Sequence, residues 1–582
     1  MTAASRHSSA PPPVTAPALT PAPASAGAAA ADIPAPVTRR WWALAAICLS
    51  VLVLGFDGTI LNVALPDMAV QLHAGTSQLQ WIVDAYLVVF AAAMLPAGLL
   101  GDRFGRRRLL IAGLSLFAVA SLVGTLTDSA ETLIAVRAVM GLGAAFIMPL
   151  AMSIIPSLFP PAERARAVAV MTSGMAVGMP LGPILGGLLL THFWWGSIFL
   201  INVPLIAVGI AALLLLVPES RNPAVPRIDV LSAVLGVGGL AALTYGIIQG
   251  PGDGWGSAPV LGCLVAAVLL LGGLILRERT QSDPMLDFTL LRDPAYRWNT
   301  LAAVLVTFVL MGALFVLPQY LQSVLGNSAL GTGVRLMPLM GGLLVAARVS
   351  ERLVARFAVR GVVTGGLLLI AAAMFLGSRT GLGDGYGWTA LWLSILGLGM
   401  GFTMVPAMGA AMAVLPEERA GVGSGLLQTL RQCASAIGVA LLGSLLLGIY
   451  TGRLHTTGLP AAAAEQARGS VSAAQAVAEQ LHDTALATSA HGAFVHGMTT
   501  VLLICGIAAA LSALLIAFRM PGDTTAVDTA GPDTAGPDTA GADSAGADTA
   551  AAGGAAGRPG GAGIPDTRAV ANAAADPGQS VV

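Results

Sequence analysis

The sequence predicts an all-α membrane protein with fourteen membrane-spanning helices. Of its 582 residues, 56% are hydrophobic and only 10% are charged, whereas soluble domains usually carry roughly 25% charged residues. Apolar runs of about 20 residues, the length that crosses a bilayer, recur along the chain. The arginines gather in alternate connections between these runs, as expected when one side of a membrane collects positive charge.

The two ends of the chain are predicted to be disordered tails. Residues 1–40 are rich in Ala, Pro, Ser and Thr, and residues 520–582 contain a repeat of the type AGPDT. Neither composition can bury a hydrophobic core. The apolar run that begins at Trp41 is too long and too far from the start for a cleavable signal peptide.

Between the tails, fourteen apolar segments follow one another, and each is long enough to be a spanning helix. The predicted helices lie at roughly 41–65, 79–100, 109–127, 131–156, 167–191, 197–217, 230–249, 258–277, 299–322, 330–350, 361–378, 387–414, 420–449 and 494–518. The connection at 450–492 is long, polar and alanine-rich, so we expect it to be partly helical.

The arginine positions set the orientation of these helices. With both ends inside, the arginines of the inner connections far outnumber the three of the outer ones, Arg379, Arg453 and Arg468. Adding or dropping one helix midway would destroy this bias. We therefore expect an even number of helices and two cytoplasmic tails. The chain has no lysine, which indicates a GC-rich bacterial genome, and the location is then the bacterial plasma membrane.

The densest charge cluster lies between the second and third apolar segments, where the chain reads GLLGDRFGRRR. Such charges cannot lie in hydrocarbon, so this segment is a short loop on the arginine-rich, cytoplasmic side. Its glycines let two helices approach closely. The residues that we expect to form a gating loop are Gly98, Asp102, Arg103, Gly105, Arg106 and Arg107.

Three charged residues fall inside the predicted spans of the first half: Asp57, Asp84 and Arg137. A charge inside the bilayer is costly, so each must face a partner or a water-filled path. A rise of 1.5 Å per residue places all three in the outer half of the membrane, and we expect Arg137 to pair with Asp57 or Asp84. The alternative for Asp57 and Arg137 is a purely structural role. The alternative for Asp84 is an interfacial acid in contact with water outside.

The predicted span at 167–191 carries glycines at every fourth position, a spacing that leaves one bare helix face for close packing. The proline within it permits a bend. The residues are Gly178, Gly182, Pro183, Gly186 and Gly187.

These motifs resemble those of the 14-helix drug:proton antiporter branch of the major facilitator superfamily. The charged loop is similar to the pattern G-x-L-x-D-R-x-G-R-[RK]-[RK]. The segment from Asp57 to Pro66, which includes Asn62, resembles D-x-T-[IV]-x-N-V-A-L-P. The glycine-rich span resembles the G-x-x-x-G-P-x-x-G-G signature of exporters.

Further positions match this branch or depart from it. Tyr86 and Arg431 match, whereas Met140 replaces the glutamine of the R-x-x-Q-G motif that begins at Arg137. In place of the acid that some relatives carry in the helix at 330–350, this chain has Arg335 and Arg348, which argues against strongly cationic substrates.

The resemblance implies an architecture of two six-helix bundles. The N-terminal bundle would span 41–217 and the C-terminal bundle 299–519, with the outer loop at 450–492. Two inserted helices with flanking cytoplasmic loops would occupy 218–298. The bundles would rock about a site near the middle of the bilayer.

The implied function is secondary active export of amphipathic small molecules in exchange for protons, with Asp57, Arg137 and Asp84 handling the protons. The alternatives are proton-coupled uptake of a metabolite and a nontransporting sensor on the same fold. No ATP-binding loop, H-E-x-x-H motif or metal-ligand spacing is present, so we expect no enzyme activity, cofactor or metal site. The expected partners are the substrate, protons and the lipid bilayer, for a chain that works as a monomer and binds no nucleic acid.

Overall fold

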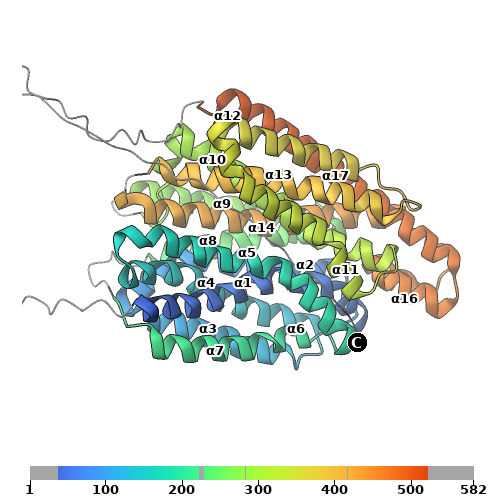
Figure 1. The fold of residues 1–582 in the computed structure, drawn as a ribbon. Helices are drawn as coiled ribbons and strands as arrows, with labels where there is room; N and C mark the ends of the chain where they lie inside the picture. Colours follow the sequence, from blue (N-terminus) through green and yellow to red (C-terminus); the bar gives the residue numbers. More distant parts are fainter. Residues whose placement is uncertain (1–36, 222–228, 282–283, 416, 522–582) are drawn as a thin grey trace, which may run out of the picture. The chain divides into compact units, whose positions relative to one another are not determined.

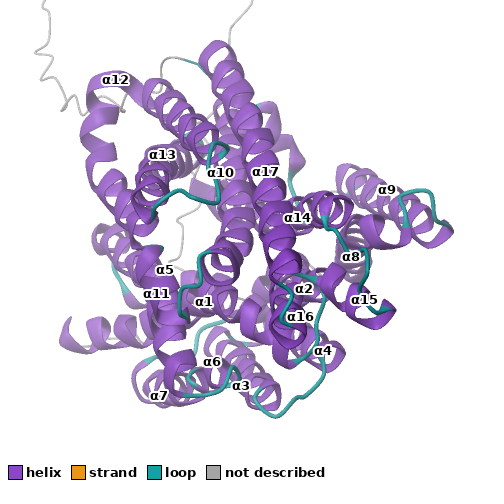
Figure 2. Cartoon of the chain, turned by 90° about the vertical axis from the view of Figure 1, so that its right-hand side faces the viewer, coloured by secondary structure: helices purple, strands orange, loops and turns teal. Residues whose placement is uncertain are grey.

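The computed structural model describes residues 37–221, 229–281, 284–415 and 417–521, so nearly all of both predicted tails lies outside the described residues. Every regular element in these ranges is a helix (Figures 1 and 2). They contain thirteen helical segments that are long and apolar enough to cross a membrane. The all-α membrane class is therefore confirmed.

The first half of the chain forms a bundle in which the apolar helices bury one another. α1 packs against α5 and α7, α2 packs against α4, and α3 packs against α4 and α7. The first helix begins at Val37, before the predicted start at 41. The bounds are α1 Val37–Gln71, α2 Thr76–Phe104, α3 Arg106–Gly124, α4 Ala130–Leu158, α5 Pro161–His192, α6 Ser197–Leu200 and α7 Asn202–Leu216.

The second half forms a bundle in which α12 packs against α13 and α17, and α10 packs against α13 and α14. The two spans predicted at 330–350 and 361–378 appear as one apolar segment, Ala329–Gly377. It is broken at Ala358, whose φ of 58° and ψ of 164° are not helical. With this break, the thirteen segments are consistent with fourteen spans. The bounds are η1 Phe288–Arg292, α10 Pro294–Gln319, η2 Tyr320–Val324, α11 Ala329–Arg335, α12 Met337–Gly377, α13 Tyr386–Ala413, α14 Glu417–Arg453 and α17 Thr484–Arg519.

The two inserted helices, α8 (Val230–Asp253) and α9 (Ala258–Thr280), form a hairpin that lies beside both bundles. Arg277 of α9 binds the Asp229 carboxylate in two places, at 2.7 Å and 3.1 Å, and Asp229 also caps the start of α8. α8 packs against α2 and α14. Ile248 of α8 shares a small apolar cluster with Trp81 of α2 and Ala440 of α14.

The connection at 450–492 is partly helical, as predicted. It contains α15 (Ala461–Gly469) and α16 (Val471–Leu481) and lies at the end of the molecule where α1 meets α2, hereafter the α1–α2 end. Thr76 Oγ1 of α2 donates to Gly469 O at 2.8 Å, and the hydroxyls of Ser472 and Ser323 of η2 are 2.7 Å apart. This connection therefore touches both bundles.

Candidate functional site

A buried ion pair joins α1 and α4 inside the first bundle. Arg137 Nη1 lies 2.9 Å from Asp57 Oδ2, and both residues are only 1% exposed. The expectation that Arg137 pairs with one of the two membrane acids is met by Asp57. A pair this deeply buried is held in a low dielectric, where breaking it leaves a costly unpaired charge.

Three further groups fix the geometry of this pair. Asn202, at the start of α7, donates its side-chain amide to Asp57 Oδ1 at 3.3 Å. The Nε of Arg137 donates to the backbone oxygen of Ile82 at 3.1 Å. The guanidinium carbon lies 4.2 Å from the centre of the Tyr86 ring, within the range of a cation–π contact.

The close approach of α2 and α4 depends on Gly141. A methyl group there would lie 2.5 Å from the backbone oxygen of Tyr86, so only glycine lets the arginine of α4 reach the tyrosine of α2. Met140, which replaces the glutamine of the related motif, has its Sδ 3.9 Å from Arg137 Nη1. A thioether is a weak acceptor and carries no proton of its own.

A cavity of about 10 Å³ adjoins the ion pair at the interface of the two bundles. Asn62, Tyr86 and Arg137 line it from the first bundle, and Met311 of α10 and Val439 of α14 line it from the second. Its volume is near the minimum for one water molecule. A movement of Arg137 would therefore change the shape of a cavity that side chains of the C-terminal bundle also line.

Asp84 of α2 is fully buried and is not part of this ion pair. Both of its carboxylate oxygens lack a hydrogen-bond partner among the described residues. Burying a carboxylate without a hydrogen-bond partner is costly. Its candidate role in proton handling stays a prediction.

The glycines of α5 bring this helix against α1 and against α11. A methyl group at Gly182 would lie 2.0 Å from Thr59 Oγ1, and one at Gly178 would lie 2.7 Å from Leu52 O. Gly186 faces Ile60 in the same way, whereas Gly187 packs against Leu330 of α11. Pro183 also faces α11, since a methyl group at Gly333 would lie 2.2 Å from the Pro183 backbone oxygen. The motif thus joins three helices and two bundles.

The charged loop between α2 and α3 is a single residue, Gly105, whose φ of 119° favours glycine. Gly98 and Gly101 before it pack α2 against α4, where methyl groups would lie 3.3 Å from Pro149 and 1.9 Å from Leu150. These close approaches explain the glycines of the motif.

The charged residues on either side of Gly105 make their contacts within the N-terminal half of the chain. Asp102 forms an ion pair with Arg106 at 2.7 Å, and Arg103 lies over the ring of Phe104, which is exposed. The Glu219 carboxylate accepts from the backbone nitrogens of Arg107 and Arg108 at 3.1 Å and 3.2 Å. It therefore caps the positive N-terminus of α3. Sequence reasoning did not identify Glu219, which lies far along the chain.

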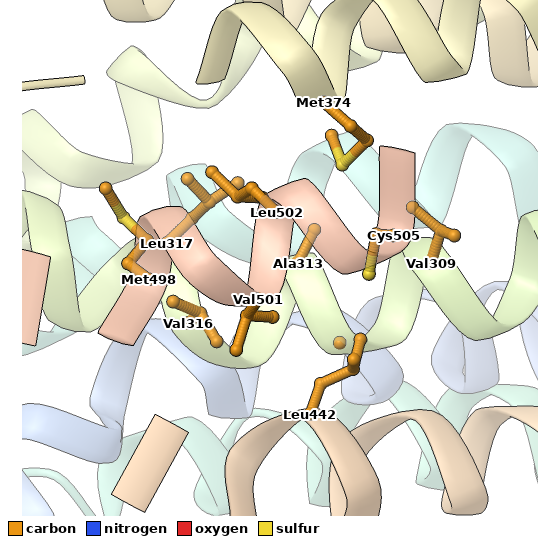
Figure 3. Close-up of a pocket in the computed structure, with 11 residues that line it drawn as sticks. Val309, Ala313, Val316, Leu317, Met374, Leu442, Met498, Val501, Leu502 and Cys505 are labelled. Carbon is orange, nitrogen blue, oxygen red and sulfur yellow. The ribbon is translucent and has the colours of Figure 1, made fainter. Parts of the chain in front are cut away.

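The C-terminal bundle holds a second small cavity, also of about 10 Å³, between α10, α12, α14 and α17 (Figure 3). Side chains such as Val309, Met374, Leu442 and Leu502 surround it. Apart from the weakly polar Cys505 thiol, only apolar side chains line it, so a water molecule would lack the partners that it needs. It is a packing gap and not a candidate site.

Hydrogen bonds between the bundles, among the described residues, lie at the α1–α2 end. The side-chain nitrogen of Gln80, on α2, donates to the backbone oxygens of Val439 and Ala440 on α14, at 3.1 Å and 2.8 Å. Gln322 of η2 donates to Val63 O on α1 at 2.8 Å. These bonds hold the bundles together at this end. Sequence reasoning did not identify Gln80, although a glutamine at the start of an apolar helix is a signal that could have found it.

Two bundles of apolar helices with a buried ion pair in the first are the architecture of a membrane transporter family. The chain belongs to the Major Facilitator Superfamily, whose family model matches residues 47–439. It is 34% identical to the tetracenomycin C resistance and export protein of Streptomyces glaucescens, over 82% of this chain and 91% of that protein. It is also 34% identical to the multidrug efflux pump LfrA of Mycolicibacterium smegmatis, over 83% of this chain and 97% of that one.

The fold also matches a solved structure. A bacterial homologue of the human lysosomal transporter Spinster superposes with a TM-score of 0.60 at 18% identity, covering 83% of this chain and 98% of that chain. At this identity the likeness concerns the fold alone.

Proposed function

We propose that this chain exports amphipathic small molecules from bacteria in exchange for protons, by alternating access. Its relatives at 34% identity are named for export, resistance and efflux. The observation that carries the proton coupling is the buried pair of Asp57 and Arg137 beside the interface of the bundles. We place both chain ends in the cytoplasm and the α1–α2 end outside, because of the arginine bias.

The coupling works through the charge on Asp57. A proton taken up at Oδ2 removes the charge that holds Arg137 Nη1 at 2.9 Å. Arg137 then keeps its contacts to Ile82 O, the Tyr86 ring and the weakly accepting sulfur of Met140. Since Arg137 and Tyr86 line the cavity that Met311 and Val439 close from the other side, its shift alters the contact between the bundles. Asp84 is a second proton site on this pathway.

The test is proton-driven efflux from an efflux-deficient bacterial host. Wild type should lower the accumulation of at least one compound in a panel of antibiotics and dyes, and a protonophore should abolish this effect. Asp57→Asn should remove it while the protein still reaches the membrane. Asp67→Asn is the matched control, since Asp67 lies on the same helix outside the ion pair, and it should keep efflux.

Two results would contradict the proposal. Normal efflux by Asp57→Asn would exclude Asp57 from proton coupling. Raised accumulation in cells that express the wild type would favour proton-coupled uptake, and an unchanged accumulation across the panel would favour a sensor.

A further inference from the structure

Arg431 of α14 is a charged residue inside the C-terminal bundle that the proposed proton pathway does not use. Its Nε donates to Thr307 Oγ1 of α10 at 3.1 Å, and its Nη1 donates to Gln428 Oε1. Its two terminal nitrogens lie 3.6 Å and 3.9 Å from the sulfurs of Met408 and Met404 on α13. All four of these partners are neutral.

No carboxylate lies within ion-pair distance of Arg431 among the described residues. The sequence provides none nearby in the bundle, because the helical stretches 294–350, 359–378, 386–413, 422–453 and 484–519 contain no aspartate or glutamate. Arg137, the corresponding cation of the first bundle, has Asp57 at 2.9 Å. The inner arginine of the first bundle therefore has a carboxylate partner, whereas that of the second bundle has none among the described residues.

An uncompensated arginine within a membrane protein is costly unless water or an anion reaches it. Arg431 is half-buried and not sealed within the bundle core. Its helix contacts the first bundle at Val439, which the Gln80 amide binds, about 12 Å further along at 1.5 Å per residue.

We propose that Arg431 is the anion-binding subsite for the transported molecule. The substrates are then amphipathic molecules with a carboxylate or another anionic oxygen, which accepts hydrogen bonds from the guanidinium. The apolar part of the substrate then packs against the sulfurs of Met404 and Met408, since thioethers adapt to different shapes. The inference rests on the proposed export function and names its substrate class.

The test compares two fluorescent probes that share a xanthene ring system, the anionic carboxyfluorescein and the cationic rhodamine 6G. Their binding to the full-length protein in nanodiscs is measured by fluorescence anisotropy, with empty nanodiscs subtracted. The variants are Arg431→Gln, Arg431→Lys and Arg279→Gln. Arg279 is exposed at the end of α9, so its substitution removes an equal charge far from the site.

Wild type should bind carboxyfluorescein more tightly than rhodamine 6G. Arg431→Gln should weaken the binding of carboxyfluorescein about ten- to a hundredfold, the range for one charge-assisted hydrogen bond, and leave that of rhodamine 6G unchanged. Arg431→Lys should restore part of the loss, and Arg279→Gln should behave as wild type. Unchanged binding of rhodamine 6G also shows that the variants are folded.

The proposal is overturned if wild type fails to bind carboxyfluorescein, if it prefers rhodamine 6G, or if Arg431→Gln weakens the binding of both probes equally. A second measurement, in proteoliposomes with a pH gradient, separates the anion-binding site from the proposed export function. Arg431-dependent binding without gradient-driven transport would refute export and keep the site. Gradient-driven transport of rhodamine 6G at equal rates in wild type and Arg431→Gln, without transport of carboxyfluorescein, would keep export and refute the site.

Discussion

Replacing Gln80 by leucine should open the α1–α2 end of the transporter. The amide of Gln80 has two hydrogens, shared among Val439 O, Ala440 O and Ser444 Oγ at 3.1, 2.8 and 3.3 Å. A net value of about 1 kcal/mol for each of two hydrogen bonds gives about 2 kcal/mol. Leucine keeps the size of the side chain but makes neither bond. The equilibrium should therefore shift by about 30-fold toward the state in which this end is open.

The assay measures the labelling rate of a cysteine at the interface. Leu61 is 2% exposed and lines the small cavity between the bundles, so Leu61→Cys reports on opening. The four native cysteines are first replaced by alanine, and a membrane-impermeant thiol reagent is added from outside. Gln80→Leu should raise the labelling rate of the new cysteine.

A matched control is available on the same helix. Gln78 accepts from Gly75 N and donates to Glu131 at 2.8 Å, both within the first bundle. Gln78→Leu should therefore leave the labelling rate unchanged. An unchanged rate in Gln80→Leu, or an equal rise in Gln78→Leu, would refute the reasoning that Gln80 holds the bundles together.

Three further predictions concern stability. Gly182→Ala should prevent stable folding, because its methyl group would lie 2.0 Å from a neighbouring oxygen, whereas Gly174→Ala, with its nearest atom at 3.4 Å, should be tolerated; equal yields of folded protein in size-exclusion chromatography would contradict this. Glu219→Gln should cost about 1 kcal/mol by weakening the cap of α3, and an unchanged melting temperature would exclude that role. The hydrogen bond from Arg277 holds the pKa of Asp229 well below its usual range. The carboxylate therefore stabilises the fold at pH values above its ordinary pKa of about 3.9. This stabilisation is lost as the pH falls toward the lower pKa that Asp229 has in the folded protein. The melting temperatures of wild type and Asp229→Asn should thus differ at neutral pH and converge below about pH 4, and a constant difference would contradict this.

Composition and periodicity were sufficient for the membrane class, because apolar length and arginine bias depend on the bilayer and not on tertiary contacts. That Arg137 pairs with a membrane acid was also predictable, since a buried charge needs a partner. The choice of Asp57 over Asp84 was not, because both acids lie at a depth similar to that of Arg137. The break in α12 was harder to place. Ala358 has a helix-favouring side chain, and only its φ of 58° reveals where the segment turns.

Contacts between distant segments could not be predicted from the sequence. Glu219 caps α3 from a position more than a hundred residues away, and nothing in its local sequence distinguishes it from any other acid near a helix end. Asn202 was not among the predicted site residues, because its hydrogen bond to Asp57 depends on how α7 packs against α1. Such residues become visible only when the helices are placed in three dimensions.

The two bundles meet along two seams, α2 with α14 and α5 with α11, and α8 covers only the first of them. Where α2 meets α14, α8 lies against both helices, and its Tyr245 ring is 6.1 Å from that of Trp81 on α2. Where α5 meets α11, the glycines of α5 make the contact directly. A molecule dissolved in the bilayer must therefore displace α8 to enter along α2 and α14, whereas α8 does not obstruct the side of α5 and α11. The inserted hairpin thus covers one of the two seams between the bundles and leaves the other without such a cover.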